Sequence, residues 1–198
     1  MSNKVVNVQH CDYCFDVLTA KLDNKPVPEA TFDDLAFPLF VTWHLHENNH
    51  GRLRGCIGNF NALHLRKGLE QYAWASASHD RRFRPISRKE VPFLSCAVSL
   101  LTDFEEAKHY LDWEIGTHGI WIEFTLESGR KTTATYLPEV MVEQAWTKDE
   151  AIDSLLRKGG YTSIIDQKKR ESIQLTRYQS QKLEQSYQDY CLRNKLPN

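Results

Sequence analysis

The segment LFVTWHLHENNHGRLRGCIGN, residues Leu39–Asn59, carries two runs of alternating side chains around a polar stretch. In residues 39–46 every second side chain is apolar, which is the period of a half-buried strand. Residues 47–51 (ENNHG) have the composition of a turn. Residues 52–59 return as a second strand, so the segment predicts a β-hairpin.

The apolar pattern also predicts the register of this hairpin. Pairing Leu45 with Leu53 and Val41 with Ile57 puts the apolar side chains on one face, whereas a slip by one residue would separate them. The other pairs of this register are His46–Arg52, His44–Arg54, Trp43–Gly55 and Thr42–Cys56. We expect the glycine to leave room for the indole that lies opposite it.

Two reactive side chains share the polar face of the predicted hairpin. Arg54 and Cys56 are two residues apart in a strand and therefore point the same way, and a guanidinium beside a thiol favours the reactive thiolate. His44 would lie diagonally from Cys56, within reach of a side-chain contact. Gly55 and Gly58 would let a ligand approach the backbone. This pattern predicts a cleft with Cys56 and His44 as candidate catalytic residues and Arg54 as an anion anchor.

Simpler interpretations of the same residues remain open. Cys56 would be a small core side chain, as most strand cysteines are, and Arg54 would pair with a carboxylate. His44 and His46 have the H-x-H spacing of metal ligands, but exposed strand histidines are the more common case. We therefore predict no metal site and no identified cofactor.

Beyond the hairpin, hydrophobic periodicity predicts a mixture of helices and strands. Cys11 and Cys14 form a C-x-x-C, but Cys11 continues the apolar stripe of a predicted helix, so we expect both thiols to pack in the core. Asn61 is expected to cap the second helix, and Thr147 with Glu150 forms a capping box. Helices are expected over residues 4–22, 61–79, 105–111, from 138, over 147–158 and around 183–191, and strands over 94–101, 119–127, 131–137 and 172–178. Because strands and helices do not alternate regularly, the expected fold class is α+β, with a mostly antiparallel sheet flanked by helices.

Composition limits the class of protein. The chain has 198 residues, a formal net charge of -1 and 41% hydrophobic residues, which fits one domain over residues 1–198. The five cysteines are scattered and odd in number, so a disulfide framework is not expected. No apolar run is long enough to span a membrane, and the first residues lack a secretory signal. We therefore expect no membrane partner and a cytoplasmic or nuclear location.

A basic segment supports a second hypothesis. Residues 50–89 contain nine Lys and Arg side chains against two acidic ones, a local surplus of seven positive charges in a nearly neutral chain. Such a surplus is typical of a phosphate-binding surface, although a solvated helix end and loop would look the same because no aromatic side chains are interleaved. The candidate binding residues of this segment are Arg54, Asp80, Arg81 and Arg82.

Two further residues are candidates to assist Cys56. His118 precedes the strand that begins at residue 119, and Glu139 opens a predicted helix. Either one would serve as a base or as an orienting group for a thiol nucleophile. The alternatives are a turn histidine and a carboxylate that complements the helix dipole.

From LRGCIG (residues 53–58) onward, the chain resembles the AMME syndrome candidate protein family and its eukaryotic branch, for which this hexapeptide is the signature. The resemblance continues through SASHDRRFRP (76–85), YLDWEIGTHGI (110–120), TATYLPEV (133–140), DSLLRKGGY (153–161) and LTRY (175–178). It implies an α+β fold with a larger and a smaller lobe and a cleft near the signature, but no reaction. Prokaryotic relatives are fused to, or encoded beside, a Memo-like protein and a radical-SAM protein, which implies a Memo-like pathway partner.

These observations leave two hypotheses from different classes of protein. In the first, the chain has a ligand-binding and catalytic cleft lined by Arg54 and Cys56. In the second, it is a non-catalytic binding module for a nucleic acid, a nucleotide, another phosphate-bearing ligand or a protein partner. The unknown small molecule of the first hypothesis and the partner of the second are not defined by the sequence.

Overall fold

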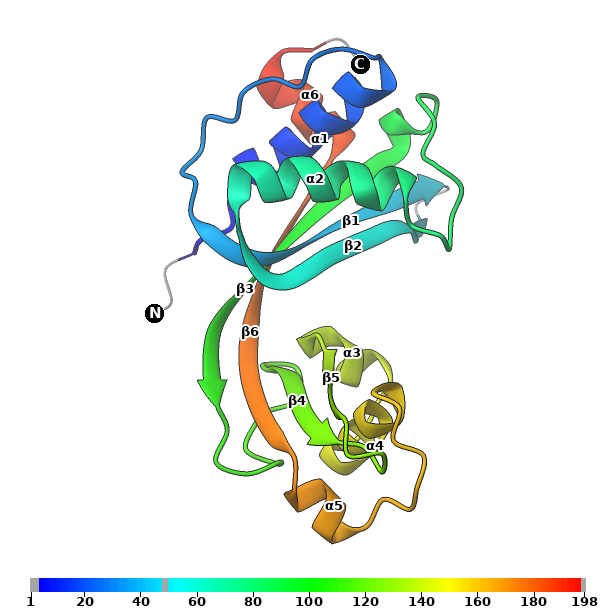
Figure 1. Ribbon diagram of the computed structural model, residues 1–198. Helices are drawn as coiled ribbons and strands as arrows, with labels where there is room; N and C mark the ends of the chain where they lie inside the picture. The colour runs from blue at the N-terminus through cyan, green and yellow to red at the C-terminus, as the bar shows by residue number, and fades with distance from the viewer. Residues whose placement is uncertain (1–3, 48–49, 197–198) are drawn as a thin grey trace. The chain divides into compact units, whose positions relative to one another are not determined.

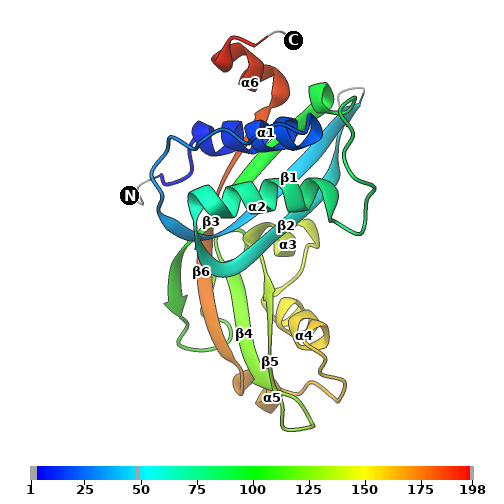
Figure 2. The ribbon, with the colours of Figure 1, turned by 45° about the horizontal axis from the view of Figure 1, so that its top comes forward.

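The computed structural model describes residues 4–47 and 50–196 (Figures 1 and 2). The chain divides into two compact units, which are described separately: unit 1 is Met1–Leu100 with Gln181–Asn198, and unit 2 is Leu101–Ser180. The elements in chain order are α1 (Val8–Leu22), β1 (Ala36–Glu47), β2 (His50–His64), α2 (Leu65–Ser78), the short helix η1 (Val91–Phe93), β3 (Leu94–Glu106), β4 (Gly119–Thr125), β5 (Lys131–Tyr136), α3 (Pro138–Glu143), α4 (Lys148–Lys158), α5 (Gln167–Glu171), β6 (Gln174–Ser186) and α6 (Tyr187–Asn194).

The strands form a six-stranded sheet in the order β2-β1-β3-β6-β4-β5. Strand β1 pairs antiparallel with β2 and β3, and β4 pairs antiparallel with β5 and β6. The predicted α+β class, with a mostly antiparallel sheet flanked by helices, is therefore confirmed. Among the described residues, no helix is both long enough and apolar enough to cross a membrane.

The predicted hairpin is present, and its register is correct only in part. The structure pairs Val41 with Ile57, Thr42 with Cys56 and Trp43 with Gly55, as predicted. The register then shifts, and the next pairs are His44–Leu53, Leu45–Arg52 and His46–Gly51, so the predicted pairs beyond Trp43 are wrong. Arg54 is the extra residue of a β-bulge, which removes it from the regular alternation of the strand. The predicted turn includes residues 48 and 49, which lie outside the described residues.

Helices α1 and α2 pack on one face of this hairpin. The indole Nε1 of Trp43 donates a hydrogen bond to the carbonyl of Ala73 at 3.1 Å, and the Trp43 ring meets Phe15 of α1 edge to face. A Cβ atom on Gly55 would lie 2.0 Å from the carbonyl oxygen of Ser76 in α2. The glycine therefore makes room for a helix backbone, and the expectation that it accommodates the indole is wrong.

The first helix begins later than predicted, at Val8, because the side chain of Asn7 accepts a hydrogen bond from the backbone and caps it. Val8 itself is 37% exposed, so the predicted apolar stripe begins one turn too early. Cys11 and Cys14 are fully buried in the core of unit 1, which confirms that the C-x-x-C packs there.

Three other boundaries differ from the prediction. Asn61 does not cap α2, because β2 continues to His64 before the helix begins. The helix predicted over residues 105–111 is absent, since β3 runs on to Glu106. Leu183 belongs to β6, so the last helix is shorter than predicted and begins at Tyr187. In contrast, the prediction that residues 94–101 are buried on both faces is confirmed.

Unit 2 has its own core. The β4–β5 hairpin is present as predicted, and alternate side chains of β4 pack against Ile152, Leu155 and Leu156 of α4. The capping box of Thr147 and Glu150 opens α4, which confirms that prediction. The ammonium group of Lys158, at the other end of α4, donates a hydrogen bond to the carbonyl of Thr135 in β5 at 2.9 Å.

Candidate functional site

The guanidinium of Arg54 is buried and donates four hydrogen bonds within unit 1. Its Nε and Nη2 atoms donate to the carboxylate of Glu90 at 2.8 and 3.3 Å, and further hydrogen bonds reach the carbonyls of Arg84 and Pro85. Burial alone would raise the pKa of Glu90, but hydrogen bonds from Arg54 and Ser87 outweigh burial and hold that pKa below its usual value. Arg54 thus fastens the loop after α2 to β2, which is the carboxylate pairing considered as its simpler role.

Asp80 and Arg82 hold the same loop to the backbone of Cys56. The Cys56 N–H donates to Asp80 Oδ2 at 2.9 Å, and Arg82 Nη2 donates to the Cys56 carbonyl at 3.2 Å. The two side chains also pair with each other at 2.7 Å. The hydrogen bond from Arg82 and the bonds from backbone N–H groups keep the pKa of Asp80 far below its usual value. We call this pair the Asp80–Arg82 clamp.

Cys56 is half-buried, and its sulfur lies on the sheet face opposite α2. The hydroxyl of Thr42 donates a hydrogen bond to Cys56 Sγ at 3.1 Å. Since Gly55 faces α2, the alternation of the strand directs Cys56 to the other side. The other four cysteines, Cys11, Cys14, Cys96 and Cys191, are all buried.

Two residues along β1 from Thr42, His44 belongs to a hydrogen-bonded network on the same face. His44 Nδ1 lies 2.9 Å from Glu184 Oε1, and the hydroxyl of Ser95 donates to the same carboxylate. His46 Nε2 lies 2.8 Å from the Ser95 hydroxyl. The hydrogen bond with His44 is the largest cause that lowers the pKa of Glu184, to about 2. Burial opposes this shift, and the hydrogen bond from Ser95 adds to it. The network therefore contains a carboxylate that is ionised at neutral pH.

This network predicts a specific dependence of stability on pH. The pKa of Glu184 is lower in the folded chain than in the unfolded chain. Its ionised form therefore stabilises the fold at pH values above the unfolded pKa, and this stabilisation is lost as the pH falls toward about 2. We expect wild type to be more stable than Glu184→Gln near neutral pH, and the difference to shrink between roughly pH 5 and pH 3 in urea unfolding. Glu29→Gln, at an exposed carboxylate of the same unit, is the control. Parallel profiles for wild type and Glu184→Gln would contradict the assigned interaction.

His118 and Glu139, the two predicted assistants of Cys56, belong to unit 2. His118 Nδ1 accepts a hydrogen bond from the backbone N–H of Glu114 at 2.9 Å, which is a turn-closing contact. Glu139 lies in the first turn of α3, where a carboxylate complements the helix dipole. Both residues therefore have the local roles that were considered as their simpler alternatives.

The basic segment contains several arginines that are paired within the chain. In addition to Arg54 and Arg82, Arg88 pairs with Asp23 at 3.1 Å, and Arg66 donates to the carbonyl of Phe32. The predicted binding residue Arg81 is exposed. The basic segment ends at residue 89, and Glu90, the partner of Arg54, is the next residue.

Three residues of the site were not identified from the sequence. Glu90 follows the basic segment directly, and a wider count of charges would have included it. Glu184 and Ser95 bond to the histidines from other strands, and no short-range pattern links them to β1.

Gly58 approaches β1 closely, because an added Cβ would lie 2.3 Å from the Leu39 carbonyl oxygen. Within residues 4–47 and 50–196, no group of three or more His, Cys, Asp or Glu side chains is arranged to hold a metal ion.

The chain has an α+β fold with two compact units, and it carries the LRGCIG hexapeptide on strand β2. A family model described as AMMECR1 matches residues 11–183, and the chain belongs to the AMMECR1 family. This confirms the resemblance seen in the sequence.

Relatives of known sequence or structure support this assignment. The uncharacterized protein At2g38710 of Arabidopsis thaliana is 52% identical over 180 residues, which cover 90% of this chain and 84% of that protein. The uncharacterized protein C688.03c of Schizosaccharomyces pombe is 39% identical, with 92% and 94% covered. The crystal structure of the uncharacterized protein PH0010 from Pyrococcus horikoshii has a TM-score of 0.71 at 21% identity, with 89% of each chain covered, which shows the same fold.

Proposed function

We propose that the sheet face of unit 1 that carries Cys56, Thr42, His44 and Glu184 binds a small polar molecule and can act on it chemically. The observation that supports this proposal is the His44–Glu184–Ser95–His46 network, which lies on the same face as the Thr42–Cys56 contact. Polar side chains from distant parts of the chain converge there, as they do in ligand sites.

The histidine is the acid–base group of the proposed site. In its neutral form, a His44 ring that donates its Nδ1 proton to the ionised Glu184 carboxylate has Nε2 left as a proton acceptor. A carboxylate that orients a histidine in this way supports general base chemistry. The pairing also limits the rotation of the ring, so its acceptor atom has a defined direction.

Cys56 is the nucleophile of the proposed site. Its thiol is half-buried, whereas the other four are buried, so a small electrophile in solution meets this sulfur first. The Thr42 hydroxyl orients the sulfur by donating to it. We assign Arg54, Gly55 and Gly58 to the support of the site rather than to ligand contact, because each is engaged with the surrounding protein. We leave His118 and Glu139 out of the site.

The alternative of a nucleic-acid-binding surface around Arg54 and the loop after α2 receives less support. Arg54, Arg82 and Arg88 are each paired with a carboxylate of the same chain, which reduces the charge that the segment offers to a partner. We therefore favour the small-molecule site over a nucleic-acid-binding module.

The proposal is tested by labelling the folded chain with three cysteine reagents of similar size: neutral iodoacetamide, anionic iodoacetate and a cationic methanethiosulfonate. The labelling rate of each cysteine is measured by mass spectrometry and divided by the rate at which glutathione reacts with the same reagent. We expect Cys56 to label first and its normalised rates to differ by about tenfold among the reagents, because a structured site discriminates charge and shape. We also expect His44→Gln to slow the iodoacetamide reaction several-fold.

The control is His64→Gln, which changes a largely exposed histidine of the same unit. It should leave the Cys56 rates unchanged. Normalised rates that are equal for all three reagents, together with no effect of His44→Gln, would show an ordinary surface thiol and would overturn the proposal.

A further inference from the structure

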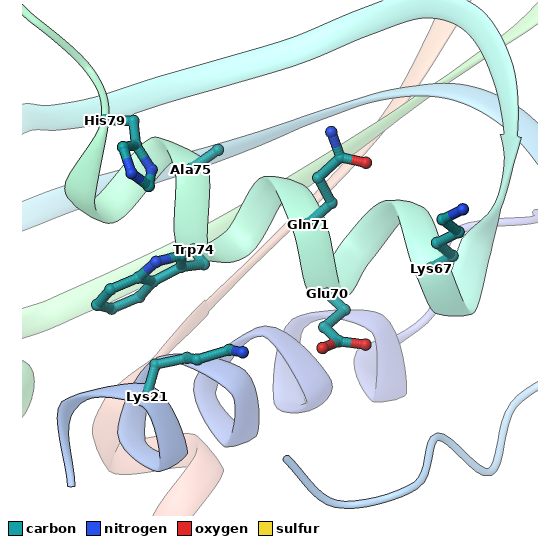
Figure 3. Close-up of a pocket in the computed structure, with 7 residues that line it drawn as sticks. All are labelled: Lys21, Lys67, Glu70, Gln71, Trp74, Ala75 and His79. Atoms are coloured by element: carbon teal, nitrogen blue, oxygen red, sulfur yellow. The ribbon is translucent and has the colours of Figure 1, made fainter. Parts of the chain in front are cut away.

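Helices α1 and α2 enclose a groove that is separate from the site proposed above, since α2 covers the opposite face of the β1–β2 hairpin. The groove has a volume of about 470 Å³. This volume is within the range of small-molecule sites. Figure 3 shows the residues that line it, which are Lys21, Lys67, Glu70, Gln71, Trp74, Ala75 and His79.

The groove offers one large aromatic surface. Trp74 is half-buried and packs against the core of unit 1, so its indole has a supported position. In Figure 3 the indole projects from α2 toward α1, and the side chain of Lys21 extends from α1 beside it. A supported indole face that borders a cavity is a stacking platform for a planar ring.

Two cations border the same groove from different helices. Lys21 is on the last turn of α1 and Lys67 on the first turn of α2, and both side chains are exposed. Within the described residues, neither ammonium group makes an ion pair or a side-chain hydrogen bond. This distinguishes them from Arg54, Arg82 and Arg88, whose charges are all compensated by carboxylates.

The positions of these groups along α2 define an order. Lys67 and Trp74 are seven residues apart, which is roughly 10 Å along a helix axis. The Lys67 end is the positive end of the helix dipole, and no acidic residue occupies that first turn. Glu70 lies between them and can accept hydrogen bonds from hydroxyl or amino groups. An anion is therefore favoured at Lys67 and a planar ring at Trp74.

We infer that the α1–α2 groove binds a nucleoside monophosphate, with the base on Trp74 beside Lys21 and the phosphate at Lys67. A second cavity of about 480 Å³ shares Lys21, Lys67 and Glu70 as lining residues, so the two cavities adjoin. The single carboxylate of the first cavity, Glu70, does not provide the ligands that a divalent cation needs.

The experiment is isothermal titration calorimetry of the full chain with AMP, adenosine and ribose 5-phosphate as probes. We expect AMP to bind with a dissociation constant on the order of 100 µM. Adenosine lacks the phosphate and ribose 5-phosphate lacks the base, so each should bind at least about tenfold more weakly. Lys67→Glu should weaken AMP binding by about tenfold or more, because it replaces a charge-assisted contact with repulsion.

Lys89→Glu makes the same change of charge at an exposed lysine outside the groove and should leave AMP binding intact. Trp74→Leu should weaken AMP and adenosine but not ribose 5-phosphate, with circular dichroism to confirm that the variant is folded. The inference is overturned if AMP shows no binding at about 1 mM, if ribose 5-phosphate binds as tightly as AMP, or if Lys67→Glu binds like wild type. Labelling of Cys56 provides an independent readout of the other site.

Discussion

Substitution of Arg54 by methionine is expected to lower the free energy of unfolding of the chain by about 3 kcal/mol. The variant removes the guanidinium that bonds to Glu90 and to two loop carbonyls, and it leaves these acceptors in a site where Arg54 is only 7% exposed. Removal of one partner of an ion pair is costly where the other charge stays partly desolvated, and the Glu90 side chain is only 25% exposed. Urea unfolding followed by circular dichroism measures the change.

The matched control for this prediction is Arg81→Met. Arg81 is exposed in the same loop, and its substitution should change stability by less than about 0.5 kcal/mol. The double variant Arg54→Met with Glu90→Gln should recover part of the loss, because it also removes the uncompensated carboxylate. If Arg54→Met were as stable as Arg81→Met, the assigned role of Arg54 in holding the loop would be wrong.

Substitution of Gly55 by alanine is expected to cost about 3 kcal/mol, because the added methyl group overpacks a tight contact. The new Cβ would lie 2.0 Å from the Ser76 carbonyl oxygen, which is a backbone atom of α2 and cannot rotate away. Helix α2 or strand β2 must therefore move. The loss should appear as a lower urea midpoint and as faster labelling of the buried cysteines of unit 1.

Gly51→Ala is the control for overpacking within the same strand. Its added Cβ would meet the ring of His46 at 2.9 Å, and that ring is the end of an exposed side chain that can shift at the cost of its hydrogen bond with Ser95. A small change is expected there. Replacing glycine by alanine lowers the backbone entropy of the unfolded chain and by itself stabilises a fold, so the expected loss at Gly55 has to come from the added methyl group. Equal losses at Gly51 and Gly55 would contradict the assigned close approach of α2.

The hairpin shows how far side-chain periodicity can predict this fold. Alternation is a local property, and it gave the correct pairing of Trp43 with Gly55 and of Thr42 with Cys56. A β-bulge adds one residue to a strand without a recognisable change in the amino-acid sequence. The alternation of apolar side chains therefore could not locate the change of register at Arg54. In the structure the side chain of this extra residue bonds to Glu90 and to the carbonyls of Arg84 and Pro85.

Contacts between neighbours in sequence were predictable, whereas contacts between residues far apart in the chain were not. The box of Thr147 and Glu150 was predictable because capping depends on neighbours in sequence. The partner of His44 is Glu184, which is 140 residues away in the chain. Strand β6 is partly exposed over most of its length, so it lacks the apolar alternation that would have predicted its full extent. A site assembled from strands so distant in sequence requires the tertiary fold.

The Asp80–Arg82 clamp has a consequence for contacts between molecules. Strand β2 is the first strand of the sheet, and the clamp occupies the N–H and the carbonyl of Cys56, where a strand from another chain would add. At the last strand, Lys158 occupies the carbonyl of Thr135. Charged side chains at both edge strands of the sheet disfavour polymerisation by intermolecular β-pairing, which is the route to amyloid-like fibrils.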